Sequence, residues 1–293
     1  MLVRKILLDF SSVDSGRLVA YWPLARRNDE EVERCLMILA IDIGNTNSCF
    51  ALLKGDECLG QWRLSTNRLR TADEFVLWLE NFFARQKVKA TEIEQSIVAC
   101  VVPSCRFPIL KAVEELVGKE ALLVTAELME TVGVQVKTDS PKEVGADRVI
   151  NAFSAFTRYS QATIVLDFGT ATTFDVADEQ GNYIGGVIAP GINLSLEALH
   201  RAAARLPSVE IKRPAKVIGT GTESAMQAGI YFGYLGMIER IVKEIKNELG
   251  VSAKVIATGG LAPLFAKNSD AIDELDADLT MRGLYQVARK FSG

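Results

Sequence analysis

Residues 38–48 read Ile-Leu-Ala-Ile-Asp-Ile-Gly-Asn-Thr-Asn-Ser, and residues 163–173 read Thr-Ile-Val-Leu-Asp-Phe-Gly-Thr-Ala-Thr-Thr. In both stretches a short apolar run ends at an aspartate, and a glycine follows two positions later. A second strand-like run, a turn and a third run come next, which predicts an antiparallel meander in each case. The two aspartates, Asp42 and Asp167, lie 125 positions apart. So long a spacing indicates a duplicated α/β domain rather than a short solenoid repeat.

The turn after each aspartate has the composition of an anion-binding loop. Glycine lets the backbone approach a ligand, successive amides can form an anion nest, and the aspartate can hold a cation or its water shell near phosphate. A single copy would fit an ordinary hairpin turn equally well, because Asp, Gly and Asn are common turn residues. Two copies on facing domains would clamp a polyphosphate. Phosphoryl transfer requires mainly positioning and charge neutralisation, so such loops predict a phosphate site.

A third motif, Ser140-Pro141-Lys142-Glu143-Val144-Gly145-Ala146-Asp147-Arg148, contains two further candidates. Asp147 could accept a proton from a substrate hydroxyl. Arg148 could bind a carboxylate or a phosphate with two parallel hydrogen bonds. The alternative is an Asp-capped helix with an Asp–Arg pair on its surface, and the sequence alone favours neither interpretation.

Composition excludes several other classes of function. The 33 basic and 37 acidic residues give a net charge of -4, which disfavours a general nucleic-acid binder. The single histidine, His200, weakens every Ser-His-Asp, Cys-His or His-rich metal scheme. Five cysteines form neither a metal spacing nor a disulfide framework. With no apolar run of membrane length and no secretory signal, we expect a cytoplasmic protein without membrane partners.

Three segments are expected along the chain. Residues 1–36 contain a charged run and no clean periodicity, so we interpret them as a loosely attached extension or a start codon placed too early, with a functional arm as the alternative. Residues 37–157 form the predicted N-terminal domain and residues 158–293 the C-terminal domain.

Two stretches carry helix-start signals. Thr71-Ala72-Asp73-Glu74 is a capping box that opens an amphipathic helix over 75–83. Thr220-Gly221-Thr222-Glu223 has the same form and opens a long helix that ends before Gly250. Small residues along this helix permit close approach of another backbone, either in a dimer or within the same domain. They are Ala225, Gly229, Gly233 and Gly236.

Taken in order, the motifs resemble those of type III pantothenate kinases over about residues 37–291. The matching set is Asp42-Ile-Gly-Asn-Thr, the run ending at Arg148, Asp167-Phe-Gly-Thr-Ala-Thr-Thr, Ala189-Pro190-Gly191, Leu206-Pro207, Thr258-Gly-Gly and Asp278-Leu279-Thr280. The resemblance implies a duplicated actin-like (ribonuclease H-like) two-domain kinase fold. It also implies ATP-dependent phosphorylation of pantothenate to 4'-phosphopantothenate, the first step of coenzyme A biosynthesis. The family is a cytoplasmic homodimer that needs potassium or ammonium, and we expect Mg²⁺ to accompany the nucleotide.

The resemblance also assigns roles residue by residue. The first ATP phosphate loop corresponds to Asp42, Ile43, Gly44, Asn45, Thr46, Asn47, Ser48 and Cys49. Thr170 corresponds to an ATP-contacting threonine, and Asp167 to the ligand of the monovalent cation. The pantothenate-contacting run corresponds to Gly145, Ala146, Asp147 and Arg148, with Asp147 as the proton acceptor.

Two positions in the expected acceptor pocket depart from the family pattern. Thr138 stands where a tyrosine is usual, and Ala203 stands where a threonine is usual. These departures leave two alternatives open. One is a nucleotide-binding paralog with weak catalysis that acts as an accessory factor in transcription, and the other is a kinase for a different small hydroxy acid.

Overall fold

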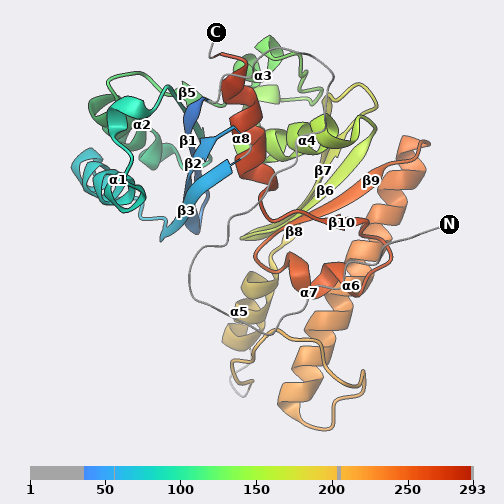
Figure 1. Cartoon of the computed structure of the whole chain (residues 1–293). Coiled ribbons are helices and arrows are strands. Elements are labelled where there is room, and N and C mark those ends of the chain that lie inside the picture. Colours follow the sequence, from blue (N-terminus) through green and yellow to red (C-terminus); the bar gives the residue numbers. More distant parts are fainter. Residues whose placement is uncertain (1–35, 56, 203–205, 292–293) are drawn as a thin grey trace, which may run out of the picture.

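The computed structural model describes residues 36–55, 57–202 and 206–291, and within them two five-stranded sheets are flanked by helices (Figure 1). The expected extension, apart from Leu36, lies outside the described residues, as does Ala203. No described helix combines the length and the apolar character needed to cross a membrane.

The first half of the chain forms one sheet and its helices. Its strands are β1 (Met37–Ile43), β2 (Asn47–Lys54), β3 (Glu57–Ser65), β4 (Gln95–Cys100) and β5 (Leu122–Leu123). Its helices are α1 (Ala72–Gln86), α2 (Pro103–Val117), α3 (Ala126–Thr131) and α4 (Ala146–Tyr159), with 3-10 turns η1 (Ala90–Glu92) and η2 (Pro141–Glu143).

The second half forms the other sheet. Its strands are β6 (Thr163–Phe168), β7 (Ala171–Ala177), β8 (Tyr183–Pro190), β9 (Lys254–Gly259) and β10 (Glu274–Leu275). Its helices are α5 (Ile192–Ala202), α6 (Thr222–Leu249), α7 (Ala262–Ala266) and α8 (Leu279–Arg289).

The two sheets have the same topology, which confirms the predicted duplication. The strand orders are β3-β2-β1-β4-β5 and β8-β7-β6-β9-β10, with the first three strands antiparallel and the last two parallel to the central one. Asp42 and Asp167 hold the same register, each next to last in the central strand. Asp42 pairs with Cys49 and Ala99, and Asp167 with Thr173 and Thr258.

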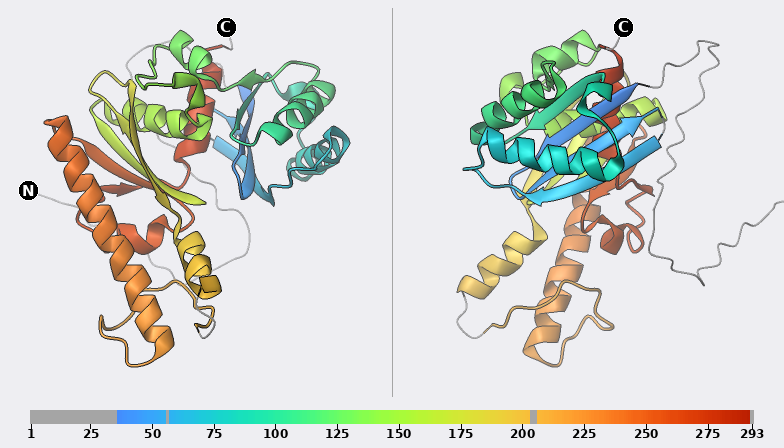
Figure 2. Two further views of the ribbon diagram at one scale, coloured as in Figure 1. Left: turned by 180° about the vertical axis from the view of Figure 1, so that it is seen from behind. Right: turned by 60° about the vertical axis from the view of Figure 1, so that its left-hand side comes forward.

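Helices α4 and α8 lie between the two sheets and are exchanged between the halves (Figures 1 and 2). Helix α4 packs on β6 and β7 of the second sheet, α8 packs on β1 and β4 of the first, and the two helices contact each other. The largest buried cluster accordingly joins strand residues such as Ile38 and Ile97 to Ile150 of α4 and Leu284 of α8. This exchange brings the first turn of α4, with Asp147, between the ends of the two sheets.

The helix-start predictions have mixed outcomes. The capping box at Thr71 is confirmed, since its hydroxyl accepts from the Glu74 amide and the Glu74 carboxylate accepts from the Thr71 amide. The expected box at Thr220 is wrong by one position. Gly221 is the N-cap of α6, and its amide donates to Ser224 Oγ over 3.1 Å. Gly250 ends α6 in the left-handed conformation, as expected.

Helices α5 and α6 extend away from the sheets on one side of the molecule (Figures 1 and 2). The small residues of α6 are exposed, and a Cβ atom built at Gly229, Gly233 or Gly236 would meet no atom within 4 Å. Within the described chain, these three glycines therefore do not serve close packing of α6 against its own domain, whereas Gly219 does approach the backbone of Ala225 closely.

Candidate active site

The two duplicated loops touch at the ends of the central strands. Thr46 follows β1 and Thr170 follows β6, and their hydroxyl oxygens lie 2.7 Å apart. Both side chains are exposed. The Asp167 carboxylate is close enough to Asp42 for its charge to add to the rise in the pKa of Asp42. The structure thus brings together two loops that the sequence places 124 positions apart.

The first loop is a tight turn closed by hydrogen bonds. The Gly44 amide donates to the Asn47 carbonyl over 3.0 Å, and Thr66 Oγ1 donates to the Gly44 carbonyl over 2.7 Å. Asn45, Thr46 and Asn47 are exposed at its tip. The side chains of Ile43 and Ser48 are buried, at 0% and 1% exposure, so these two positions have only backbone groups to offer a ligand. Cys49 is half-buried in β2, where burial raises the pKa of its thiol.

Two glycines let other segments approach the second loop. A Cβ atom at Gly191, after β8, would lie 2.0 Å from the Thr170 carbonyl oxygen. Gly259, at the end of β9, has φ of +90°, and a Cβ there would lie 2.6 Å from Asp167 Oδ1. Any larger residue at either position would displace Thr170 or Asp167.

Four carboxylates meet beneath the two loops: Asp42, Asp147, Asp167 and Asp175. Burial is the main cause that raises the pKa of Asp167 to about 7 and that of Asp175 to about 6, with neighbouring carboxylates adding to it. Burial likewise raises the pKa of Asp42, followed by the charges of Asp147 and Asp167. Asp42 Oδ1 is buried and accepts no hydrogen bond. A buried anionic cluster of this kind costs free energy in the absence of a cation.

The motif that contains Asp147 does not form a surface cap. Ser140 precedes only the 3-10 turn η2, and Gly145, not an aspartate, is the N-cap of α4. Asp147 lies in the first turn, where Oδ1 accepts from the Arg148 amide over 2.8 Å and burial raises its pKa. The Arg148 side chain pairs with buried Asp175 instead, with Nε 2.6 Å from Oδ1. The alternative of a surface Asp–Arg pair is therefore wrong.

The sequence analysis assigned no role to three residues at this site, although Thr280 belongs to one of the matching motifs. Asn151 Nδ2 donates to Asp167 Oδ2 over 3.2 Å, and Thr280 Oγ1 of α8 donates to Asn151 Oδ1 over 2.7 Å. Asn151 is four residues after Asp147, so helical periodicity could have placed it on the same face. Asp175 is the third of these residues. The sequence feature that could have indicated it is a charged side chain inside a largely apolar strand.

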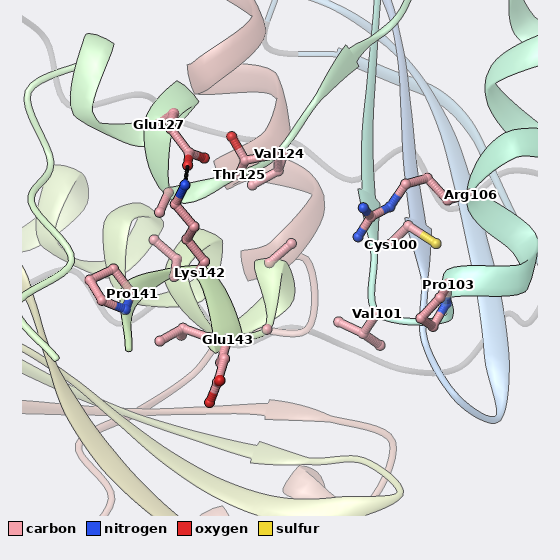
Figure 3. A pocket seen from close by; sticks show the side chains of 15 residues that line it. Cys100, Val101, Pro103, Arg106, Val124, Thr125, Glu127, Pro141, Lys142 and Glu143 are labelled. Carbon is pink, nitrogen blue, oxygen red and sulfur yellow. Dashed lines mark ion pairs between the residues drawn. The ribbon is translucent and has the colours of Figure 1, made fainter. Parts of the chain in front are cut away.

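A cavity of about 370 Å³ opens beside Gly145 and Ala146 (Figure 3). Lys142 and Glu127 form an ion pair of 3.2 Å on its wall, and Arg106 reaches in from α2. Thr138 does not line this cavity, and its hydroxyl is buried without a hydrogen-bond partner.

Within the described ranges, no group of three or more His, Cys, Asp and Glu side chains is arranged to hold a metal ion. One or two carboxylates can hold a cation together with other oxygens, such as backbone carbonyls or phosphate. Asp42, with an unpartnered oxygen, and Asp167 have the chemistry for such a ligand set.

Comparison with known proteins gives a consistent result. The sequence model of the type III pantothenate kinase family matches residues 38–244. A type III pantothenate kinase of Paramagnetospirillum magneticum is 51% identical, covering 87% of this chain and 98% of its own. That of Rhodospirillum rubrum is 50% identical with the same coverage.

Solved structures support the fold. A Campylobacter jejuni protein assigned to the Baf family of transcriptional activators aligns with a TM-score of 0.57 at 19% identity, over 86% of this chain and 98% of its own. A Sinorhizobium meliloti protein assigned as a 2-dehydro-3-deoxygalactonokinase gives 0.53 at 15% identity, over 86% and 96%. These similarities concern the fold alone, and they confirm the expected actin-like sugar-kinase architecture.

Proposed function

The chain belongs to the type III pantothenate kinase family, and from this premise we propose how its residues carry out the reaction. Members phosphorylate pantothenate with ATP in coenzyme A biosynthesis, and this chain does the same. The observation that carries our assignment of roles is the meeting of Asp147 with Asp42 and Asp167 beneath the contact between Thr46 and Thr170.

The two loops bind the phosphates of ATP. Asn45, Thr46 and Asn47 offer amides and short polar side chains from the first loop, and Thr170 offers its hydroxyl from the second. Gly44, Ile43, Ser48 and Cys49 hold the loop in shape or contribute backbone groups. Such preorganised donors neutralise phosphate charge without reorganising during the reaction.

A monovalent cation, K⁺ or NH₄⁺, fits beside Asp167, and Mg²⁺ bound to the nucleotide fits beside Asp42. When bound, these ions would offset the charge of the carboxylates and of the phosphates. The unpartnered Asp42 oxygen and the high pKa of Asp167 support this assignment. Asn151 orients Asp167, because Thr280 occupies the amide oxygen and leaves the NH₂ group facing the carboxylate.

Asp147 accepts the proton of the pantothenate primary hydroxyl as that oxygen attacks the γ-phosphorus. Burial raises the pKa of this carboxyl, which makes it a stronger base than an exposed aspartate. Gly145, Ala146, Arg148 and Thr138 contact the acceptor around it. Ala203, outside the described residues, stays a predicted acceptor contact.

The direct test of the function is an ADP-release assay of the purified chain, with and without pantothenate, in potassium buffer. We expect ADP release that depends on pantothenate, and a product whose mass equals pantothenate plus one phosphate. ADP release that is the same without an acceptor, or faster with another hydroxy acid, would contradict the assignment.

Removing the Thr170 hydroxyl should weaken nucleotide binding specifically. We expect Thr170→Val to raise KM for ATP by about three- to tenfold, the effect of one lost hydrogen bond. KM for pantothenate should stay within twofold, because Thr170 lies on the nucleotide side. Thr220→Val, an exposed threonine that caps no helix, is the matched control. A rise in KM for pantothenate alone would refute the assignment of Thr170 to ATP.

We propose that the chain forms a homodimer through the side that carries α5 and α6. Three exposed apolar side chains belong to α5 or to the segment that joins α5 to α6: Leu194, Val217 and Ile218, the last of which is 83% exposed. Gly229, Gly233 and Gly236, at which an added Cβ atom would meet no other atom within 4 Å, also lie on α6. Exposed apolar surface of this kind is typical of an interface.

The dimer proposal predicts a variant that dissociates. Light scattering should give twice the chain mass of 32.0 kDa for the wild type. Ile218→Asp should shift the mass toward one chain, because a buried unpaired carboxylate destabilises an interface. Leu69→Asp, at an 88% exposed leucine of the first half, should leave the mass unchanged. If wild type and Ile218→Asp had equal masses, this surface would be ruled out as the dimer interface.

We place the enzyme in the cytoplasm. All four described cysteines are free thiols, which suits a reducing compartment.

A further inference from the structure

Asp175 on β7 is completely buried, with 0% of its surface exposed, and it accepts three hydrogen bonds. Arg148 Nε donates to Oδ1 over 2.6 Å, and Tyr183 Oη donates to the same oxygen over 3.1 Å. Thr173 Oγ1 donates to Oδ2 over 2.8 Å. The donors come from α4, β8 and β7, so this carboxylate joins three elements that the chain brings together only on folding.

The consequence for Arg148 is a fixed guanidinium. Its Nε is committed to Asp175, and its carbon lies 5.8 Å from the centre of the Tyr183 ring, within cation–π range. Its Nη2 atom is buried and donates to nothing among the described residues. An unpaired donor on a buried cation is costly, so the arrangement is suited to an anionic partner.

A second unpartnered group lies on the neighbouring segment. The Lys137 amide donates to the Tyr183 carbonyl over 2.8 Å, which places the next residue, Thr138, beside this strand. The Thr138 hydroxyl is also buried without a partner. Arg148 and Thr138, each with a free donor, therefore both lie beside Tyr183 at the start of β8, whereas the phosphate loops offer Thr46 and Thr170.

We propose that Asp175 is a positioning residue, which with Tyr183 and Thr173 aims Arg148 Nη2 at the carboxylate of the acceptor. This inference rests on the proposed function, in which Asp147 meets the hydroxyl of the same acceptor. Pantothenate carries a single anionic group, and a guanidinium with a free N–H pairs best with an anion. The Asp175 network thereby determines selectivity for an acidic acceptor over a neutral one.

Tyr183→Phe is the most informative variant, because it keeps the buried ring and the Arg148–Asp175 ion pair and removes one hydrogen bond. The readout is kcat/KM for pantothenate divided by that for pantothenol, in which a CH₂OH group replaces the carboxylate. We expect this ratio to fall by about three- to tenfold, through KM for pantothenate and not through KM for ATP or kcat. Tyr231→Phe is the matched control, since Tyr231 is equally buried but its hydroxyl has no partner.

Thr173 supplies an independent pair of variants. Thr173→Val should lower the pantothenate to pantothenol ratio, and Thr173→Ser, which keeps the hydroxyl, should restore it. Asp175→Asn should lower the ratio by at least about tenfold if the variant folds, as checked by circular dichroism, because the amide no longer balances the guanidinium charge.

The outcomes separate the inference from the function on which it rests. If the wild type fails to phosphorylate pantothenate, the proposed function fails. A second result would overturn the inference even if the wild type is active: Tyr183→Phe and Thr173→Val lose activity equally toward pantothenate and pantothenol, or lose none. Asp175 would then serve only the packing of α4. A change confined to KM for ATP would also overturn it, because Arg148 would then serve the nucleotide.

Discussion

Replacing Asp147 with asparagine is expected to lower kcat by about 10²–10⁴-fold while ATP binding persists, because the amide cannot accept the hydroxyl proton. The side chain keeps its size, and the amide oxygen can still accept from the Arg148 amide, as Oδ1 does over 2.8 Å. The first turn of α4 should therefore stay intact. Steady-state ADP release gives kcat, and calorimetric titration with a non-hydrolysable ATP analogue gives the affinity.

Asp139→Asn is the matched control for this experiment. Asp139 is exposed and immediately precedes the same motif, so the substitution removes a comparable charge outside the cluster of four carboxylates. Its substitution should leave kcat within twofold. Turnover in Asp147→Asn within a few-fold of wild type would remove Asp147 as the base, and loss of analogue binding would assign it to the nucleotide instead.

Replacing Asp167 with asparagine is expected to reduce activity by at least about 100-fold and yet to stabilise the protein in buffer free of K⁺, NH₄⁺ and divalent ions. The loss of activity follows from the loss of the carboxylate proposed to hold the monovalent cation. The gain in stability follows from removing a buried charge beside Asp147 and Asp175. A gain of ~1 kcal/mol would raise Tm by about 2–4 °C in a chain of this size.

The pH dependence of this stability gain has a defined sign. The pKa of Asp167 is about 7 in the folded protein, against an ordinary value of 3.8. Between these values the unfolded chain releases a proton that the folded chain retains, so the free energy of unfolding of the wild type falls as the pH rises. The Tm difference between Asp167→Asn and wild type should be small near pH 4, grow toward pH 7 and stay constant above it.

Potassium provides the control for the same pair of proteins. Added KCl should raise the Tm of the wild type more than tetramethylammonium chloride does at equal ionic strength, and it should not do so for Asp167→Asn. A Tm that is lower in the variant at pH 8, or an equal response of both proteins to K⁺, would contradict the cation assignment.

Much of the architecture was predictable from the sequence, because repeated local patterns reflect repeated local structure. Asp42 and Asp167 each end an apolar run before a glycine, and the structure places both at the same register of identical sheets. The exchange of α4 and α8 was not predictable. An amphipathic pattern shows that one face of a helix is buried, but not which sheet covers it.

The site was predictable only in part, for a related reason. Asp42, Asp147, Asp167 and Thr170 stood out because each lies near the end of a strand, in a turn or at a helix start, with glycine nearby. Asp175 and Asn151 lie inside a strand and a helix, and their partners depend on the hairpin register and on the packing of α4. Ile43 and Ser48 were assigned to ATP as members of a motif, although their side chains face the interior.

The central claim is that the two duplicated loops together hold the phosphates of ATP against the acceptor hydroxyl. A crystal structure of the chain with a non-hydrolysable ATP analogue, pantothenate, magnesium and potassium tests it most directly. We expect the β- and γ-phosphates between Thr46 and Thr170, and the pantothenate primary hydroxyl within hydrogen-bonding distance of Asp147. Phosphates bound away from either loop, or a hydroxyl remote from Asp147, would contradict the account.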